Sequence, residues 1–483
     1  MKDIRVYQPE LQVSLHKTIT RKTTNGKDAT SQRFQGSADR MVIDLLPFIG
    51  EAGAVQVSKS LAQPAGGWQV TLADRSLESG GSFETLYGLI EPMDMIEIRM
   101  RHGTPATAGK LPVVMRGFVT DVSRAEAMGG GGAPQRAVVV SGQDYGKVWQ
   151  IIQVNYFAGY LVGQSFISDF KLFEQFGIGY DTTLAPAKFL EQVVTKVLNP
   201  YIAKMLPENA TLPSSIQLDA TVKGGTVSPG IQTQEGTIFE LLRQYGDVGA
   251  WNELFIEDRD DGVFCVYRPN PYLDVTTGEK IQADAPDPVY VDVDHIDVMA
   301  LRVSRSDANV SNFYWVESPR FNLITDSYRR QATAAANDPT VVLKDYPNSD
   351  AKLYGNRVLR VATQQGGSDM KTHNTGGRAA DVQSLEKSAA GWIDGRRRIL
   401  VESNRDNVLM EHGTIRMRGR EDIKPGRYLR LHRGDFEAIY YITQVEHEFV
   451  PFSGFFSTVN VERGTGFVRR ITRGGSPYLA ELS

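Results

Sequence analysis

Residues 425–431, Pro-Gly-Arg-Tyr-Leu-Arg-Leu, form a pattern typical of a turn followed by a strand with alternating apolar side chains. Residues 438–445, Ala-Ile-Tyr-Tyr-Ile-Thr-Gln-Val, have the pattern of the next strand. After a loop at Pro451 to Gly454, residues 457–464, Ser-Thr-Val-Asn-Val-Glu-Arg-Gly, continue in the same way. Apolar residues at every second position are typical of antiparallel strands with one buried face. This part of the sequence therefore predicts a small β-barrel.

The same order of turns and strands occurs near the N-terminus. Pro92 to Ile98 predicts a turn and a strand, Val114 to Val122 a second strand, and Val138 to Gly142 a third strand after a glycine-rich loop. The identity between the two regions is low, but apolar positions correspond: Ile96 and Ile98 to Leu429 and Leu431, and more loosely Val119 and Val122 to Ile442 and Val445. The alignment predicts two similar barrels in one chain. Chance similarity between two β-meanders stays open as the alternative, because alternating strands resemble one another.

The predicted fold class is mainly β with α+β insertions: two similar small antiparallel β-barrels in one chain, connected by helical and mixed segments. We expect the following divisions: 1–150 for the first barrel, 151–288 for an α/β connecting domain, 289–318 for strands joining the second barrel, 319–409 for an insertion and a long helix, 410–473 for the second barrel, and 474–483 for a C-terminal tail.

Three segments between the barrels depart from the period of two. Helical spacing predicts helices at 185–206 and 235–246, and a hairpin is expected across 251–267. A long helix is expected at 378–403, with an apolar stripe made of Val382, Leu385, Ala389, Trp392, Ile393, Ile399 and Leu400. We expect this helix to pack on the second barrel or to bridge to the first. Arg396 should face the stripe and form a buried ion pair, whereas Lys387, Arg397 and Glu402 should be exposed.

Composition and charge limit the classes of function. The 483 residues include 53 Lys or Arg and 57 Asp or Glu, which gives a formal net charge of −4. Surfaces that grip nucleic acid or an anionic membrane need a basic excess, which could here exist only as a local patch. The single cysteine, Cys265, is expected in the core, since one thiol can form neither an internal disulfide nor a multi-cysteine zinc site. No signal peptide or membrane span is expected.

The sequence predicts no catalytic, cofactor-binding or metal-binding residue. The run Gly129–Gly132 precedes a strand and not a helix, so it fits a hairpin tip better than a phosphate-binding loop. The acidic groups Asp258–Asp261 and Asp292–Asp297 lack the spacing of a calcium loop. A calcium or carboxylate site remains the weaker alternative there, because Asp292 and Asp294 would share one face of a strand.

In their order along the chain, these motifs resemble those of phage baseplate hub proteins, a family related to late control protein D and to the N-terminal part of type VI spike proteins. The stretches that carry the resemblance are Pro425 to Leu431, Tyr440 to His447, Gly454 to Thr458, Val461 to Gly464, Asp94 to Ile98, Arg116 to Val119, and Ser141 to Asp144. The resemblance covers both ends of the chain, and the middle only by the order of elements. No repetitive β-helix follows the second barrel, which favours a hub that carries a separate spike protein.

The resemblance implies a structural protein rather than an enzyme. Its role would be that of a central baseplate hub, a homotrimer that joins the six-fold tail tube to the three-fold spike and leaves a channel for DNA. The implied partners are a tail tube or tube-initiator protein, a spike protein and other baseplate proteins, with a tape measure protein as a further candidate. The implied location is the tail tip of the virion, after assembly in the host cytoplasm. Two alternatives stay open: a hub-like distal protein of a non-contractile tail, and a cell-wall-acting tail enzyme.

Overall fold

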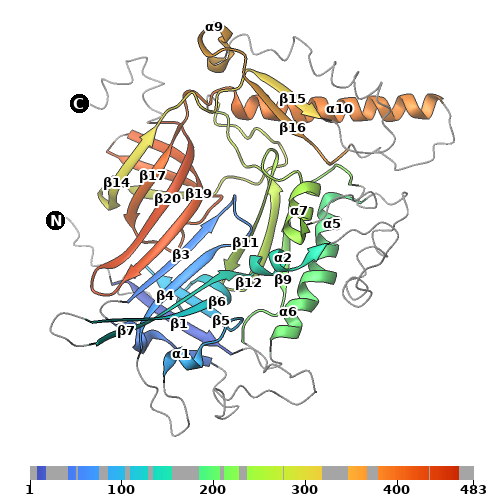
Figure 1. Ribbon diagram of the computed structural model, residues 1–483. Helices are drawn as coiled ribbons and strands as arrows, with labels where there is room; N and C mark the ends of the chain where they lie inside the picture. Colours follow the sequence, from blue (N-terminus) through green and yellow to red (C-terminus); the bar gives the residue numbers. More distant parts are fainter. Residues whose placement is uncertain are drawn as a thin grey trace.

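The computed structural model (Figure 1) is mainly β and contains one sheet of 13 strands and three small sheets. It describes residues 8–17, 42–50, 53–74, 85–103, 109–128, 134–154, 184–206, 211–227, 236–275, 277–317, 346–366, 379–434 and 436–466. The large sheet is formed from both ends of the chain, and the longer helices belong to the segments between them. The fold class predicted from the alternating strands is confirmed.

The N-terminal half of the large sheet forms the first barrel, with the strand order β2–β1–β5–β6–β7–β4–β3, all antiparallel. Its strands are β1 (Glu10–His16), β2 (Val42–Asp44), β3 (Ala54–Ser60), β4 (Gly67–Ala73), β5 (Met95–Arg101), β6 (Val113–Met128) and β7 (Pro134–Asp144). The helices α1 (Leu86–Leu89) and α2 (Gly146–Ile151) and the short turn η2 (Leu46–Phe48) lie beside it. Alternate apolar side chains from all strands but β2 form its core.

The C-terminal half of the sheet forms the second barrel, with the strand order β13–β18–β19–β20–β17–β14. Its strands are β13 (Tyr290–Asp294), β14 (Val298–Ser304), β17 (Glu411–Arg418), β18 (Tyr428–Arg433), β19 (Phe436–Val450) and β20 (Gly454–Gly464). The 3₁₀ turn η5 (His295–Asp297) connects β13 to β14. All pairs are antiparallel except β13 with β18. A separate apolar core fills this barrel.

Five strands repeat in the two barrels, because β5–β6–β7–β4–β3 correspond in order and direction to β18–β19–β20–β17–β14, and they share one irregularity. In the first, the pairing of β6 with β7 shifts between Val119 and Asp121; in the second, the pairing of β19 with β20 shifts between Ile442 and Gln444. Counting from these bulges places Ile96 and Ile98 at the positions of Leu429 and Leu431. Val119 and Val122 likewise fall at the positions of Ile442 and Val445, so the alignment predicted from sequence is confirmed.

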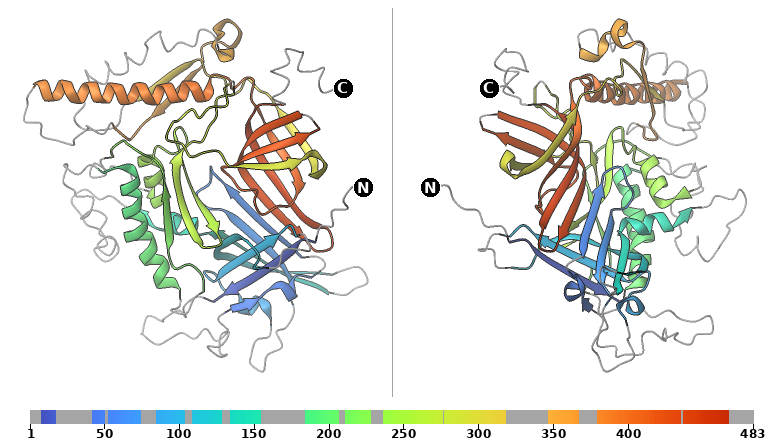
Figure 2. Two further views of the ribbon diagram at one scale, coloured as in Figure 1. Left: turned by 180° about the vertical axis from the view of Figure 1, so that it is seen from behind. Right: turned by 60° about the vertical axis from the view of Figure 1, so that its left-hand side comes forward.

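A middle unit of helices and strands packs against both barrels. It consists of α5 (Pro186–Val193), the π-helical turn η3 (Val194–Leu198), α6 (Asn199–Met205), α7 (Ile238–Tyr245), and the strands β8 (Gln153–Val154), β9 (Ile216–Ala220), β10 (Gly236–Thr237), β11 (Asn252–Arg259) and β12 (Gly262–Pro269). The predicted helices and hairpin are confirmed, and Cys265 is buried as expected. Figures 1 and 2 show β11 and β12 between the helices and the second barrel.

The long helix α10 (Ala379–Asn404) forms as predicted but packs elsewhere than expected. Ile393 and Leu400 contact Trp251 and the two-stranded parallel sheet of β15 (Phe313–Glu317) and β16 (Val358–Ala362). Both views in Figure 2 place α10 across one end of the molecule, beyond the barrels. Short turns, α9 (Ala351–Tyr354) and η7 (Pro347–Ser349), precede β16. The expectation that this helix packs on a barrel is therefore wrong, because the small sheet offers an apolar face of its own.

The arginines of α10 correct one further expectation. Arg396 is buried and faces Asp247, with Nη2 and Oδ2 3.5 Å apart, so the predicted buried ion pair is confirmed. Arg397 was expected to be exposed but is buried, and it donates to Asp394 at 2.6 Å. Trp392 is only half-buried, with the Arg396 guanidinium 4.5 Å above its ring. The expected stripe residues from 382 to 389, and Lys387, lie among side chains outside the described set.

The segment 289–318 also departs from its expected place in part. Strands β13 and β14 pair with β18 and β17 of the second barrel, as expected for strands that join it. Strand β15 instead pairs with β16, so this part of the expectation is wrong. The remaining divisions of the chain into domains stay predictions.

Replacement of Gly142 tests the close packing at the β6–β7 bulge. A Cβ there would lie 2.0 Å from the carbonyl oxygen of Phe118 and 2.4 Å from the ring of Trp68. We expect Gly142→Ala to lower the free energy of unfolding in urea by about 1–3 kcal/mol, because the core is overpacked. The control Gly391→Ala lies in open space on α10 and should be neutral or stabilising. Equal losses in both variants would contradict the packing described.

Candidate assembly surface

The two barrels share one continuous sheet because β19 has two partners along one side. Its first half pairs with β18, up to Tyr441, and its second half pairs with β3 of the first barrel, from Gln444 to Phe449. Its other side pairs with β20. The bulge at Thr443 lies where the partner changes, and bulges bend a strand and increase its twist. Strand β19 thus leaves its own barrel and covers the edge of the other.

This pairing buries the edge strand β3. Val55 and Val57 are 0% and 1% exposed, and they lie opposite Phe449 and His447 of β19. Val55 belongs to the core of the first barrel, and Phe449 packs against that core. The junction between the barrels therefore has the character of a protein core and not of a loose surface contact.

A buried cluster of three charged side chains lies next to the junction and stabilises it. The Nζ of Lys59, on β3, donates to Asp144 Oδ2 at 2.9 Å and to Asp258 Oδ2 at 2.6 Å. Asp144 ends β7, and Asp258 belongs to β11 of the middle unit. Burial alone would lower the pKa of Lys59, but the two carboxylates outweigh it and raise this pKa above its usual value. The lysine is charged, and it ties the first barrel to the middle unit.

The middle unit also forms a polar contact with each of the two barrels. From the first barrel, Arg116 Nη1 donates to the carbonyl oxygen of Gly262 at 3.1 Å. From the second barrel, the Tyr441 hydroxyl donates to Glu253, which also accepts a hydrogen bond from Arg268 Nε at 2.9 Å. Because the middle unit contacts both barrels, it stabilises their relative orientation.

Each barrel also has the strand that could form a second junction of this kind, but in the described part of the chain neither strand has a partner on that side. Strand β14 occupies in the second barrel the place that β3 has in the first, yet within the described ranges it pairs only with β17. Strand β6 occupies the place of β19, and its outer half, 121–128, pairs only with β7 there. Figure 1 shows the β6–β7 hairpin extending beyond the barrel. These two stretches form the candidate assembly surface.

The acidic groups singled out in the sequence have structural partners. Asp292 accepts hydrogen bonds from Arg430 Nε at 2.6 Å and lies 2.9 Å from His432 Nε2, and these contacts lower its pKa. Asp294, exposed two residues further along the same strand, accepts from the backbone N–H of Ile296 and caps η5. Asp258 belongs to the Lys59 cluster. The residues Gly129–Gly132 lie outside the described part of the chain.

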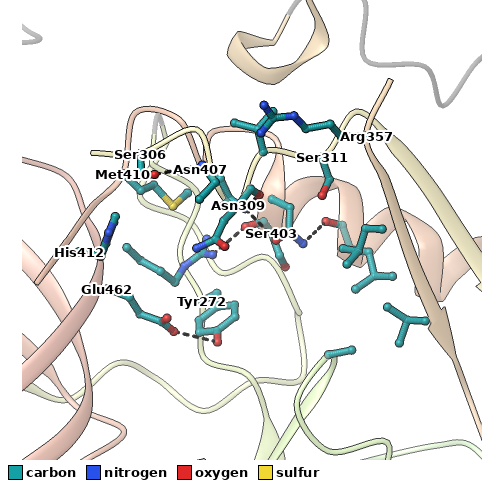
Figure 3. A pocket seen from close by; sticks show the side chains of 18 of the residues that line it. Tyr272, Ser306, Asn309, Ser311, Arg357, Ser403, Asn407, Met410, His412 and Glu462 are labelled. Carbon is teal, nitrogen blue, oxygen red and sulfur yellow. Dashed lines mark hydrogen bonds between the residues drawn. The ribbon is translucent and has the colours of Figure 1, made fainter. Parts of the chain in front are cut away.

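A polar cavity lies apart from these acids, none of which lines it. It holds about 650 Å³ between the end of α10, the loop before β15, and the ends of β17 and β20 (Figure 3). Tyr272 donates to Glu462 at 3.4 Å on one side, whereas Arg357 lies at the other end and donates to Asp307. A serine and a histidine meet beside it, Ser304 Oγ and His412 Nε2 at 3.4 Å, but they are exposed neighbours on β14 and β17. The arrangement favours no particular reaction.

Among the described residues, no group of three or more His, Cys, Asp or Glu side chains is placed to hold a metal ion. Within the same ranges, none of the helices has the length and hydropathy needed to cross a bilayer.

Removal of the Lys59 charge should weaken the junction strongly. In Lys59→Met, two buried carboxylates lose their cation, and we expect the free energy of unfolding to fall by about 3–5 kcal/mol. The exposed pair Lys188–Glu191 provides the control, since Lys188→Met should cost no more than about 0.5 kcal/mol. Denaturant titrations of both variants measure the difference. The triple variant Lys59→Met, Asp144→Asn, Asp258→Asn should recover part of the loss; no recovery would contradict the electrostatic origin.

His447 should make the junction sensitive to acid. Its Nε2 donates to the Ile423 carbonyl at 3.2 Å and its Nδ1 accepts from the Ser457 hydroxyl at 2.8 Å, so the ring is neutral. Burial lowers its pKa from 6.5 to about 4. Between these values the unfolded chain binds a proton that the folded chain does not, so stability falls as the pH drops from about 6.5 to about 4.

The loss from His447 amounts to about 3 kcal/mol when fully developed. Urea unfolding at pH 7 and pH 4 measures it. The variant His447→Gln keeps a donor for Ile423 without titrating in this range, so its pH dependence should be smaller by about that amount. Identical pH profiles of the two proteins would show that His447 is not the acid-sensitive group.

Comparison with known proteins gives similarity of structure without similarity of sequence. No protein-family model matches the chain, and no curated protein matches its sequence. A tail protein from Neisseria meningitidis MC58 has a TM-score of 0.44 at 11% identity, over 94% of this chain and 96% of that one. The 43 kDa tail protein of prophage MuSo2 from Shewanella oneidensis has a TM-score of 0.42 at 12% identity, again over 94% and 96%.

A chain of the Francisella PdpA–VgrG complex has a TM-score of 0.38 at 10% identity, over 95% of this chain and 59% of that one. A phage P2 baseplate structure is also among the matches. The solved structures that this chain resembles are thus phage tail and baseplate proteins and a VgrG complex.

Proposed function

We propose that the chain is a structural protein of a phage tail, the central hub of the baseplate, and that it works as a homotrimer. The observation that carries the proposal is the matched pair of barrels, with five strands in the same order and an equivalent bulge in β6 and β19. A tail tube is six-fold and a spike is three-fold. Three chains with two barrels each present six similar barrels around one three-fold axis.

The rigid link between the barrels supports this role. Six similar barrels can meet a six-fold partner only if the two within a chain keep a fixed relation. The β3–β19 pairing and the Lys59 cluster supply that relation. In this assembly the barrels contact a tail tube or tube-initiator protein on one face. A separate spike protein binds the three-fold face, and other baseplate proteins, with a tape measure protein as a further candidate, complete the tail tip.

The charge of the chain is compatible with a channel that DNA traverses. Each phosphate contact raises the affinity for DNA steeply, so a basic lumen would retain the genome. The formal net charge of −4 offers no such excess. We propose accordingly that DNA passes through the trimer without stable binding, and that the protein resides in the virion after assembly in the host cytoplasm.

Two alternatives predict different results. A distal protein of a non-contractile tail would share the barrels, and cryo-electron microscopy of the tail tip would reveal a tail without a contractile sheath. A cell-wall-acting enzyme would clear peptidoglycan in zymograms, and the clearing would depend on a side chain such as Asp292. The contacts of Asp292 with Arg430 and His432 are those of an exposed ion pair, which gives the enzyme little support.

The trimer is tested by mass. Native mass spectrometry of the assembled tail-tip complex should give three times the chain mass of 53.5 kDa for the hub component. The free chain should associate more weakly, with the trimer favoured by concentration and by added tube or spike protein. A stable dimer or a hexamer of this chain in the tail would contradict the symmetry argument.

A further inference from the structure

We propose that the outer half of β6 in one copy pairs with β14 of the next copy, in the register that β19 and β3 adopt within a single chain. The inference rests on the proposed trimer and specifies its contact. Inside the chain, one barrel extends a β-hairpin arm, β19–β20, over the free edge of the other. The β6–β7 hairpin is the same arm on the first barrel, and β14 is the same edge on the second.

The register follows from the repeat. Counting from the bulges, positions 121–126 of β6 correspond to positions 444–449 of β19. In the first barrel, Val140 of β7 pairs with Val70, which pairs with Val55 of β3. In the second barrel, the equivalent Val459 of β20 pairs with Ile415, which pairs with Leu301 of β14. Leu301 therefore occupies the position of Val55. Since Val55 lies opposite Phe449, Leu301 should lie opposite Glu126 of the neighbouring copy. Ser304 should then lie opposite Ser123.

The side chains of β14 are more exposed than their counterparts on β3, because no described strand covers the edge of β14. Val55 is 0% exposed because β19 covers it, whereas its counterpart Leu301 is 46% exposed. Met299, on the same strand, is 58% exposed. An uncovered edge strand with apolar side chains is a ready site for pairing with another strand. A second copy supplies the strand that has the matching shape, namely the projecting half of β6.

The charges on the two strands allow this register. It brings Arg124 of one copy diagonal to Arg305 of the other, on the same face. Each arginine already has a carboxylate of its own: Arg124 Nε lies 2.9 Å from Asp74 Oδ2, and Arg305 Nη2 lies 3.0 Å from Glu411 Oε1. The arginines are therefore neutralised before the copies meet, and their approach leaves no unpaired charge.

The contact is head-to-tail, because each copy offers one arm and one edge. Such a contact closes into a ring when its rotation divides a full turn, and otherwise forms an open filament. If each junction between copies repeats the junction within a copy, the six barrels alternate around a ring of three chains. All six are then joined by the same kind of strand pairing.

Cysteine cross-linking of the full chain tests the register. The native Cys265 is buried, so introduced cysteines react alone. In the variant Ser123→Cys with Ser304→Cys, oxidation should give a ladder of dimer and trimer on a non-reducing gel, with nothing larger. Ser58 and Glu446 are the equivalent pair within one chain, so Ser58→Cys with Glu446→Cys should form an internal disulfide without a gain in mass. Ser123→Cys with Val303→Cys, shifted by one residue, should cross-link poorly because its side chains face opposite ways.

The outcomes separate this inference from the proposed function. Trimers in native mass spectra without a 123–304 cross-link would overturn the β6–β14 contact and leave the trimer standing. Monomers under all conditions, including the assembled tail tip, would overturn both. A ladder that continues beyond three chains would contradict the closed ring.

A single substitution tests the edge independently. Leu301→Glu should leave the melting temperature of the monomer unchanged, since the side chain is half exposed, but should abolish trimers, because it places a second carboxylate directly opposite Glu126 of the neighbouring copy. Leu353→Glu, at an exposed position on α9, should affect neither property. Loss of folding in Leu301→Glu would show that the side chain serves its own barrel, and unchanged trimer formation would show that β14 is not the interface.

Discussion

Strand β19 changes partner halfway along its length, and the arrangement of the barrels depends on this change. Up to Tyr441 the strand completes its own barrel with β18; from Gln444 it pairs with β3 of the other barrel. The extra residue at Thr443 provides the twist that the change requires. Backbone pairing is directional and its register is fixed by which side chains are buried, so the link holds both the spacing and the angle of the barrels.

The middle unit turns this link into a rigid one. A strand pairing alone would allow a hinge between the barrels. Lys59, Arg116 and Glu253 are largely buried charged side chains where the two barrels and the middle unit meet, and each has an ion-pair or hydrogen-bond partner there. Breaking a buried pair costs far more than forming it gains, so such contacts act mainly to select one arrangement over others. The unit thus restricts the barrels to a single relative orientation.

The sequence predicts those parts of the fold whose side chains alternate in a regular period. Ile96 and Leu429 could be aligned because both lie on strands with one buried face, whereas the bulges at Thr120 and Thr443 become visible only in the strand pairing. Strand β16 escaped prediction because its alternate side chains are only half covered, and its partner β15 is parallel and distant in the chain. Arg397 was misplaced because a charged side chain is rarely fully buried; its i,i+3 partner Asp394 is visible in the sequence but is itself 40% exposed and gives no sign of that burial. The Lys59 cluster joins residues from three elements, and charges that meet only in the folded state leave no local signal.

The long separation between β3 and β19 also affects how the chain is made. Ser58 and Gln444, which meet at the junction, are 386 residues apart. At ordinary rates of synthesis, about 5–20 residues per second, the ribosome takes roughly 20–80 s to deliver the partner of β3. The first barrel can fold in that time, but its edge stays open. Polar side chains at Gln56, Ser58 and Ser60 alternate with the apolar ones along that edge. Lys59, on the same face as Val55 and Val57, adds an inward-pointing charge to that edge, which disfavours pairing of the open strand with other copies before the last strands are synthesised.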